Sequence, residues 1–413
     1  MSPPDPIPHS ARARLPAGIW VLGLVSMLMD ISSELIHSLL PVFLVTELGA
    51  SALALGVIEG TAEAVALIVK VFSGALSDYL GRRKPLAVAG YALGAMSKPL
   101  FAIAGSAAMV FAARFIDRVG KGIRGAPRDA LVAEIAPAEI RGAAFGLRQA
   151  LDTVGAFIGP LAAVGLMLAW SNDFHAVFWL AAIPGALAVA LLALGIREPS
   201  GPRPTAGRAP IEWHTLHRLG RSYWWIVAVG VIFTLARFAE AFLVLRAERG
   251  GLPLAWIPLV LVAMNLVYSV SAYPFGRLAD RWSRPGLLAL GLITLLAADL
   301  VLALVSTWQL VLMGVAIWGL HLGITQGLLS TMIADAAPAE LRGTAFGFYG
   351  LLCGLAMLGS STLAGLLWDQ VGPAATFVVG GLFCLLALAV VLRTRGHIRA
   401  DAPGSAGTGA PPT

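Results

Sequence analysis

The chain is poor in charged residues and in cysteine. Only 13% of its 413 residues are charged, while 58% are hydrophobic. A soluble globular domain usually carries about 25% charged residues, so this composition excludes a large soluble core and indicates an integral membrane protein. The two cysteines, Cys353 and Cys384, both lie in apolar runs. No disulfide framework is therefore implied, and we expect two small packing residues.

The polar segments between the apolar runs lack catalytic features. They contain no paired nucleophile and base, and no metal-binding motif. We therefore expect no enzyme activity, no cofactor, no metal and no nucleic-acid partner. The expected partners are a small-molecule solute, protons and the lipid bilayer, and we expect a monomer.

Twelve apolar segments are long enough to cross a bilayer, which requires roughly 20 mostly apolar residues. The first begins near Ala17 and exceeds the roughly 7–15 residues of a signal-peptide core, so we expect it to remain as a transmembrane helix. The predicted spans cover residues 17–46, 52–78, 86–104, 107–134, 142–169, 175–196, 223–246, 254–279, 286–305, 308–333, 343–368 and 374–393.

The cations outside these spans predict the orientation, because cytoplasmic loops carry an excess of Lys and Arg. One side holds the cluster at residues 82–84, the Arg residues of a linker and those of the C-terminal tail, whereas the opposite loops hold Arg246 and Arg249. We expect a multi-pass protein of the cytoplasmic (inner) membrane with both termini cytoplasmic. The expected parts are an N-tail (1–16), a six-helix half (17–196), a linker (197–222), a second half (223–395) and a disordered tail (396–413).

The two halves contain an internal repeat. The segment APAEIRGAAFG at 136–146 recurs as APAELRGTAFG at 337–347, and GALSD at 74–78 recurs as GRLAD at 276–280. The offsets are 201 and 202 residues. Parallel repeats of six spans are typical of secondary transporters, whose substrate site lies near the membrane midplane between the halves.

The loop after the second predicted span resembles a motif of the major facilitator superfamily, G-x-x-x-D-x-x-G-R-R-x. Residues 74–84 match it, and residues 276–284 keep its first Gly, its Asp and its first Arg (Gly276, Asp280 and Arg284) but have Ser283 in place of the second Gly. The resemblance covers residues 17–395 and implies an all-α membrane fold of twelve helices in two pseudo-symmetric halves. It also implies a cytoplasmic gate between the halves, and the alternative is that these charges only set the topology. The implied gate residues are Asp78, Arg82, Arg83, Asp280 and Arg284.

The fifth predicted span carries a second resemblance, to a motif typical of the exporters of this family. Gly146, Gly155, Gly159 and Pro160 have its spacing, although Ala163 and Val164 stand where further glycines are usual. Small residues permit close helix approach, and a proline within a helix bends it. The resemblance therefore implies export.

The fourth predicted span contains RFIDRVGKGIRGAPRD, in which three glycines spell the fingerprint of a dinucleotide-binding loop. That loop requires a preceding strand and a following helix, and neither fits a membrane span. The segment instead resembles the family motif R-F-x-Q-G-x-G-x-G, with Asp in place of Gln. At about 100° per residue its charges occupy an arc of about 140°. Each costs ~2.5–3.5 kcal/mol at mid-membrane, so we expect them to face a wet cavity rather than lipid. They are Arg114, Asp117, Arg118, Lys121, Arg124, Arg128 and Asp129.

Acids on the first and second spans supply the counter-charges for this face. Protonation of a carboxylate releases its paired cation, so we expect Asp117 and Glu34 to hold Arg118 or Lys121 only when they are ionised. The predicted proton-coupling residues are Asp30, Glu34 and Asp117. The predicted substrate-binding residues are Arg114, Arg118, Lys121, Arg124, His37, Glu59, Glu63, Trp318, His321 and Gln326.

These features favour a proton-coupled antiporter that exports a small anionic or zwitterionic organic solute or drug by alternating access. One alternative is a divalent-metal exporter whose ligands are Asp30, Glu34, His37, Glu59 and Glu63. A second is a membrane receptor or sensor, which would bind a ligand without flux. A third interpretation assigns the charges to a purely structural ion-pair network. The sequence offers no account of Asp299 in the ninth span.

Overall fold

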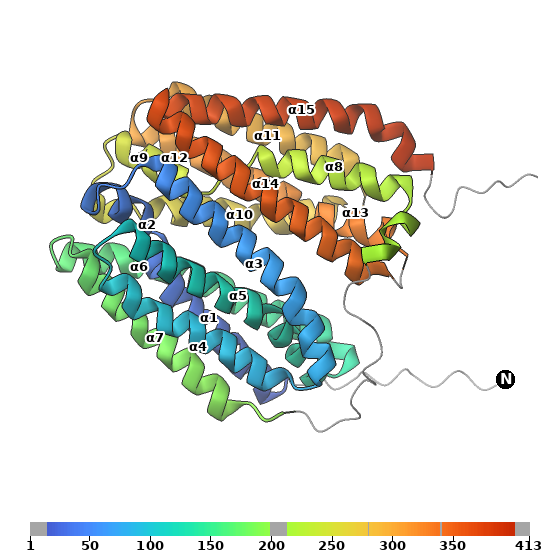
Figure 1. Ribbon diagram of the computed structural model, residues 1–413, viewed down its shortest axis with the longest axis horizontal. Helices are drawn as coiled ribbons and strands as arrows, with labels where there is room; N and C mark the ends of the chain where they lie inside the picture. Colours follow the sequence, from blue (N-terminus) through green and yellow to red (C-terminus); the bar gives the residue numbers. More distant parts are fainter. Residues whose placement is uncertain (1–14, 199–212, 280, 339–340, 401–413) are drawn as a thin grey trace, which may run out of the picture.

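The computed structural model describes residues 15–198, 213–279, 281–338 and 341–400, and within these ranges the chain is helical with no strand. The first half (blue to green in Figure 1) and the second half (yellow to red) form two adjacent bundles. The helices of the first half are α1 (Ala17–His37), α2 (Leu40–Val42), η1 (Phe43–Glu47), α3 (Ala52–Leu80), α4 (Arg83–Ala102), α5 (Ala107–Ile135), η2 (Ala138–Ile140), α6 (Arg141–Ala169) and α7 (Phe174–Gly195).

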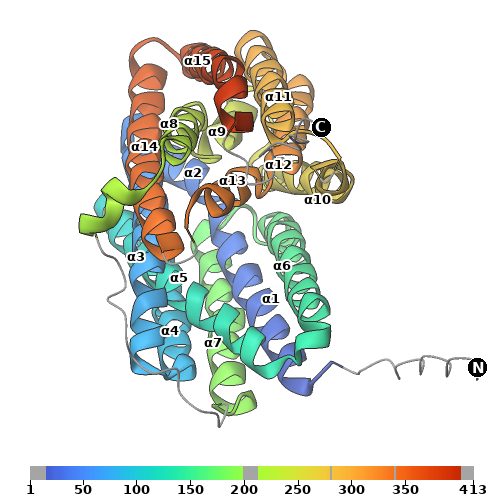
Figure 2. The same ribbon diagram turned by 90° about the vertical axis from the view of Figure 1, so that its right-hand side faces the viewer.

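The second half repeats this order. After η3 (Trp213–Arg218) in the linker, its helices are α8 (Arg221–Leu235), α9 (Ala241–Arg249), η4 (Leu254–Trp256), α10 (Leu259–Ala279), α11 (Arg284–Leu304), α12 (Trp308–Thr325), α13 (Leu328–Ala336), α14 (Arg342–Gln370) and α15 (Pro373–Ala400). Figure 2 shows the two bundles one above the other. In the described part of the chain, nine helical stretches are long and apolar enough to cross a membrane. The other three predicted spans correspond to α4, to the charged α5 and to the divided pair α8–α9.

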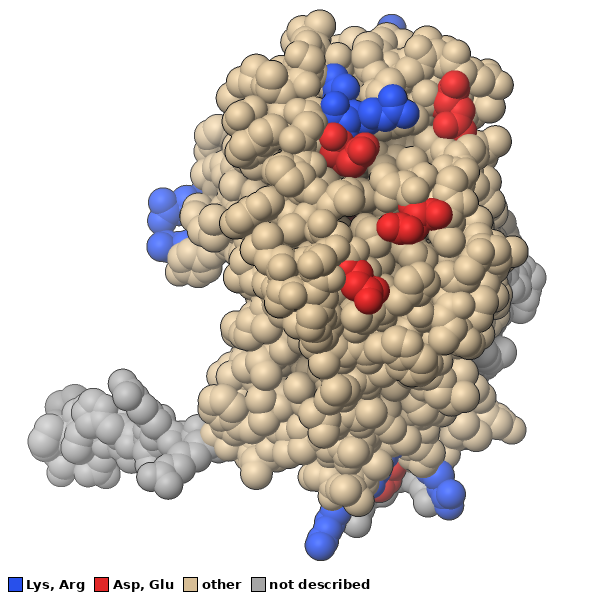
Figure 3. Space-filling view, turned by 90° about the vertical axis from the view of Figure 1, so that its left-hand side faces the viewer, with Lys and Arg blue, Asp and Glu red and all other residues tan. Residues whose placement is uncertain are grey.

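Each span runs between two ends of the molecule. The linker end contains the residues at which α1, α4, α6 and α8 begin, and the far end contains those at which α3, α5, α7 and α15 begin. The far end lies on the left-hand side of Figure 1, and Figure 3 shows that few charged side chains reach the surface there.

The first predicted span is confirmed as one membrane span, but its helix is interrupted. α1 ends at His37, and α2 begins after two turn residues. Pro41 has no N–H to donate to the carbonyl of His37, so the helical hydrogen bond at that position is lost and the helix breaks there. The peptide groups beside the break are partly satisfied by a tighter bond from the N–H of Leu39 to the carbonyl of Ile36, at 3.0 Å.

The seventh predicted span also contains a break in its helix. α8 ends at Leu235 and α9 begins at Ala241. Two serines of α14 satisfy the freed backbone groups: the Ser360 hydroxyl donates to the carbonyl of Arg237, and the N–H of Ala239 donates to Ser361 Oγ, both at 3.1 Å. Irregular backbone at membrane depth is tolerated where protein groups satisfy it.

These two breaks are at equivalent positions of the repeat, because Phe238 in the second break lies 201 residues after His37, at which the first break begins. The tenth span is also divided, at Gln326 and Gly327, and Gly327 has a positive φ of 72°. Only glycine adopts this left-handed conformation without steric cost.

The boundary between the halves is formed mainly by the antiparallel helices α3 and α14. Glycines let the two backbones touch near the far end: a Cβ added to Gly365 would lie 2.3 Å from the carbonyl oxygen of Ala52. Toward the linker end the helices separate, and a Cβ on Gly350 would lie 3.8 Å from its nearest neighbour, Val71. The carboxylate of Asp369 also caps α3 at the far end. The halves are therefore closed at the far end and diverge toward the linker end.

Candidate functional site

A cavity of about 280 Å³ lies between the two halves. Its first-half wall is charged, and its second-half wall is mostly apolar. Both breaks contribute to it, because Pro41 follows the first break and residues 237–240 form the second. Transporters commonly bind substrate at such interrupted helices near the membrane midplane. The lining residues are Glu34, His37, Pro41, Glu59, Glu63, Arg114, Arg118, Lys121, Arg237, Phe238, Ala239, Glu240, Ala241, Val244, Leu261, Trp318 and Met357.

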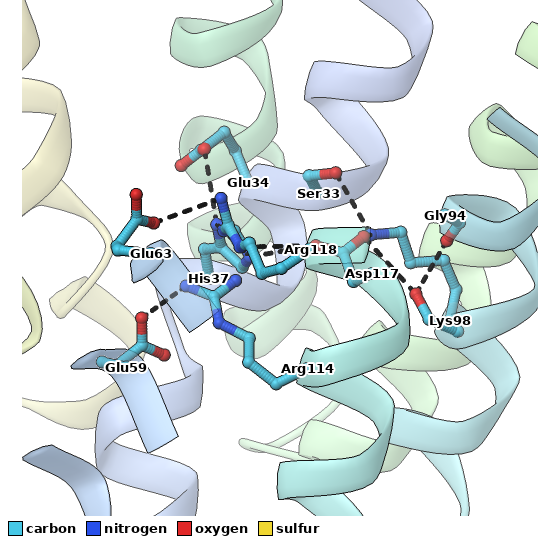
Figure 4. Close-up of polar contacts among 11 residues, drawn as sticks. Ser33, Glu34, His37, Glu59, Glu63, Gly94, Lys98, Arg114, Asp117 and Arg118 are labelled. Carbon is cyan, nitrogen blue, oxygen red and sulfur yellow. Dashed lines mark hydrogen bonds and ion pairs between the residues drawn. The ribbon is translucent and has the colours of Figure 1, made fainter. Parts of the chain in front are cut away.

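Arg118 on α5 is the centre of the charged wall, as Figure 4 shows. Its Nη2 lies 2.6 Å from His37 Nε2, its Nη1 lies 3.3 Å from Glu63 Oε1, and its Nε lies 3.7 Å from Asp117 Oδ2. The side chain is only 2% exposed. A buried cation requires such partners because its desolvation is otherwise uncompensated. One arginine thus ties α1, α3 and α5 together.

Arg114 lies one turn away from Arg118 and has a separate partner. Its Nη2 donates to Glu59 Oε2 on α3 at 2.5 Å. Both side chains are buried, and both line the cavity. The predicted binding residues Arg114, Glu59, Arg118 and Glu63 are therefore brought together as ion pairs that bridge α3 and α5.

Asp117 points away from the cavity toward α4. Its Oδ1 accepts a hydrogen bond from Lys98 Nζ at 2.7 Å, and that Nζ also donates to Ser33 Oγ at 3.1 Å (Figure 4). Lys98 is 0% and Asp117 2% exposed. Asp117 Oδ2 also lies 3.7 Å from Arg118 Nε, as expected, but its nearest cation is Lys98, which the sequence did not assign to it. A lysine inside an otherwise apolar span was the signal, since such a charge requires a buried partner.

The predicted acids Asp30 and Glu34 lie on α1 where α6 approaches most closely. A Cβ on Gly155 would lie 3.0 Å from Asp30 Cβ, and a Cβ on Gly159 would lie 2.6 Å from Glu34 Cβ. Glu34 lines the cavity, and Asp30 lies one turn nearer the linker end. Two of the motif glycines thus let α6 pack against these two acids.

The other members of the fifth-span motif behave differently. Gly146 has no atom near the position that a Cβ would take, and Pro160 is buried within α6. α6 continues through this proline from Arg141 to Ala169. Helix bending at Pro160 therefore stays a prediction.

The remaining charges of α5 form a second group nearer the linker end. The Arg124 guanidinium lies 5.0 Å from the centre of the Tyr91 ring, a cation–π contact, and does not line the cavity. Arg128 donates to Asp129 Oδ1 at 3.1 Å, and Arg148 Nη1 donates to Asp152 Oδ2 at 3.0 Å. Longer ion pairs of 4.0 Å join these residues into one cluster.

The second-half predictions divide into one residue in the cavity and two outside it. Trp318 lines the cavity. His321 is fully buried, and its Nδ1 donates to the carbonyl of Gly291 at 2.8 Å, so it packs between α11 and α12. Gln326 is exposed at the end of α12.

The sequence interpretation missed Arg237 as a cavity residue. Arg237 and Glu240 flank the break and line the cavity. The Arg237 guanidinium lies 5.6 Å from the centre of the Phe233 ring. The sequence repeat could have indicated it, because the offset of 201 residues makes residues 237 and 238 equivalent to residues 36 and 37 of the first half.

The predicted gate residues take part in contacts within each half. Arg83 Nε donates to Glu134 Oε1 at 2.8 Å, and Arg284 forms an ion pair with Asp335. The two pairs are structurally similar, because each joins the first residue of a helix (Arg83 of α4, Arg284 of α11) to the last turn of the span that follows it. Arg82 is exposed. The side chain of Asp78 and the whole of Asp280 lie outside the described residues, so their role stays a prediction.

The five residues of the metal-exporter alternative are Asp30, Glu34, His37, Glu59 and Glu63. Among the described residues, no three His, Cys, Asp or Glu side chains come together as a metal site. Glu59 and Glu63 are instead engaged by Arg114 and Arg118, and His37 by Arg118.

Comparison with known proteins gives relatives over nearly the whole chain. The Major Facilitator Superfamily model matches residues 22–357 and 247–412. An uncharacterised MFS-type transporter of Methanocaldococcus jannaschii is 30% identical over 381 residues, which cover 90% of this chain and 94% of the relative. Multidrug resistance protein MdtH of Yersinia pestis is 26% identical over 359 residues, which cover 85% of this chain and 86% of the relative.

Solved structures resemble the fold at lower sequence identity. A POT family transporter in complex with 5-aminolevulinic acid matches with a TM-score of 0.77 and 14% identity, covering 95% of this chain and 99% of that chain. At this identity the likeness shows the fold alone. The predicted architecture of twelve spans in two six-helix halves is thereby confirmed.

Proposed function

Because the chain belongs to the Major Facilitator Superfamily, a family of membrane transporters rather than enzymes, we propose that it is a proton-coupled secondary transporter that exports a small organic solute by alternating access. The observation that carries the proposal is the cavity between the halves, which is lined by charges and by two interrupted helices. The closed far end and the divergence toward the linker end fit one of the two states that alternating access requires.

Orientation is part of the proposal. We place the linker end and both termini in the cytoplasm, because the cationic clusters of the sequence lie on that side and cytoplasmic loops carry the positive excess. The described conformation then faces the cytoplasm. In the opposite conformation, the gate motif of Asp78 and Arg82 would join the two halves at the linker end.

Glu34 and Asp117 are the main candidates for proton coupling, and Asp30 is the next. Glu34 faces the cavity and lies 3.7 Å from His37, which in turn contacts Arg118. Asp117 contacts both Lys98 and Arg118. A proton taken up at Asp117 would weaken its contacts with Lys98 of α4 and His37 of α1. A proton taken up at Glu34 would weaken its contact with His37, and either change would alter the packing of the first half.

Export of organic solutes is supported by two observations. The glycines of the exporter motif pack against Asp30 and Glu34, and the relative from Yersinia pestis is named a multidrug resistance protein. The engagement of Glu59, Glu63 and His37 by arginines leaves these groups poorly placed to bind a divalent metal.

The test is solute flux in proteoliposomes with an imposed pH gradient, using full-length protein. Wild-type protein should accumulate solute against its gradient. Glu34→Gln and Asp117→Asn should each lose gradient-driven accumulation while they keep exchange of labelled for unlabelled solute. Gradient-driven accumulation at the wild-type level in both variants would contradict the coupling. Binding without any flux would instead indicate a receptor.

A further inference from the structure

The charges of the cavity wall are balanced in number. Four acids line it, Glu34, Glu59, Glu63 and Glu240, and four cations line it, namely Arg114, Arg118, Lys121 and Arg237. His37 presents a ring nitrogen 2.6 Å from the Arg118 Nη2 donor, and an imidazole that accepts this bond is neutral. The wall as a whole therefore carries no net formal charge.

The arrangement of these charges separates two groups. Arg114 forms an ion pair with Glu59, and Arg118 forms one with Glu63, both within the first half. In the described part of the chain, Lys121, Arg237 and Glu240 form no ion pair within 4.0 Å that the structure records, and Glu34 lies 3.7 Å from the neutral His37 but within 4.0 Å of no recorded cation; all four line the cavity. Lys121 is exposed and lines the cavity, and the Arg237 guanidinium lies 5.6 Å from the centre of the Phe233 ring. Charges of both signs are thus left for a ligand.

The second-half wall adds an apolar surface. Phe238, Val244, Leu261, Trp318 and Met357 line the cavity from the break of the seventh span and from α9, α10, α12 and α14. Phe238 and Trp318 have ring centres 5.3 Å apart. A ligand that fills the space between the two walls therefore needs an apolar part as well as its charged groups.

From this charge balance we propose that the site binds a small zwitterion with an apolar substituent. Its anionic group contacts Lys121 and Arg237, its ammonium group contacts Glu240, and its apolar part packs against Phe238 and Trp318. A ligand with a net charge would leave a residual charge in a poorly solvated cavity, which is unfavourable, whereas a zwitterion leaves none. This inference rests on the proposed transport function and names the substrate class.

The test uses matched probes that share an apolar group and differ in charge. One set is phenylalanine, 3-phenylpropanoate and 2-phenylethylammonium, and the other is leucine, 4-methylpentanoate and 3-methylbutylammonium. Binding to full-length purified protein is measured by calorimetry and thermal shift. In at least one set the zwitterion should bind wild-type protein tenfold or more tightly than either ion. Equal or tighter binding of the ions in both sets, or no binding by either zwitterion, would overturn the proposal.

Two variants test the assignment of the charges. Lys121→Gln leaves the wall one positive charge short, so the zwitterion should weaken at least tenfold and the cation should bind better than the anion. Glu240→Gln should produce the opposite preference. Lys70→Gln, which removes an exposed cation of α3 outside the cavity, is the matched control and should keep the wild-type order. The same order in all three variants would contradict the assignment.

Flux separates this inference from the proposed function. Zwitterion binding without flux in proteoliposomes would support the ligand class and overturn transport. Proton-coupled flux of net-charged probes alone would support transport and overturn the zwitterion.

Discussion

Asp369 at the end of α14 caps the first turn of α3 across the boundary between the two halves. Its Oδ1 accepts from the N–H of Ala52 at 3.0 Å, and its Oδ2 accepts from the N–H of Leu53 at 2.8 Å. The first N–H groups of a helix have no partner within it, and a carboxylate there is stabilised by the helix dipole. The contact exists only while the far end is closed, so it favours the conformation described here.

We therefore expect Asp369→Ala to shift the population toward opening at the far end. Loss of an N-cap costs roughly 0.5–2 kcal/mol, which corresponds to a population shift of roughly 2- to 30-fold. The measurement is the spin-label distance between Glu47 and Arg249, which lie at the far end in different halves. Asp369→Asn keeps one acceptor oxygen and should give an intermediate shift. An unchanged distance distribution in both variants would show that Asp369 does not hold the far end closed.

A second prediction compares two buried charges at equivalent positions of the repeat. Lys98 on α4 and Asp299 on α11 are offset by 201 residues. Lys98 is paired with Asp117, but the Oδ1 of Asp299 has no hydrogen-bond partner among the described residues, and its Oδ2 has only Cys384 Sγ, at 3.9 Å. Breaking a buried pair leaves a charge uncompensated, whereas replacing an unpaired carboxyl group by an amide breaks no ion pair.

Lys98→Met should therefore destabilise the protein by about 3–5 kcal/mol, and Asp299→Asn should be neutral or stabilising. Thermal unfolding of the purified protein in detergent measures both. Adding Asp117→Leu to Lys98→Met should recover part of the lost stability, because it removes the unpaired acid. A similar loss of stability from Lys98→Met and Asp299→Asn would show that the two charges are equally well satisfied.

The glycines of α6 provide a third prediction with an internal control. Gly159→Ala places a Cβ 2.6 Å from Glu34 Cβ, so α6 must move away from α1, and transport and stability should both fall. Gly146 in the same helix has no neighbour within 4 Å of its Cβ position. Gly146→Ala should therefore stabilise the helix by up to about 1 kcal/mol and keep transport. Equal transport by both variants would show that close packing at Glu34 is not required.

The orientation gives a fourth prediction. Arg82 and Arg249 are both exposed and lie at opposite ends of the molecule. Arg82→Cys should react with a membrane-impermeant thiol reagent only after the cytoplasmic face is made accessible, whereas Arg249→Cys should react in intact cells. The two natural cysteines are buried and give a low background. Reaction of the Arg82→Cys variant in intact cells would reverse the orientation.

The spans and the charged face of α5 were predictable because local composition determines them. Apolar length gives the spans, and the helical period places the α5 charges on one side. The break after Leu235 was not predictable in this way, since the groups that satisfy its backbone, Ser360 and Ser361, lie more than a hundred residues away in α14. The pair of Lys98 with Asp117 likewise depends on how α4 packs against α5.

The glycine contacts between α3 and α14 near the far end provide a pivot about which each half can rotate. The backbones touch at Gly56, where a Cβ would lie 2.1 Å from the carbonyl oxygen of Ser361, and they separate toward the linker end. A helix of 29 residues is about 43 Å long at about 1.5 Å per residue. A rotation of about 10° about the far end would move the linker end by about 7 Å, but Glu59 and Glu63 by only about 2–3 Å. A movement of about 2–3 Å at Glu59 and Glu63, which a single ligand contact can impose, thus corresponds to a movement about three times larger at the linker end.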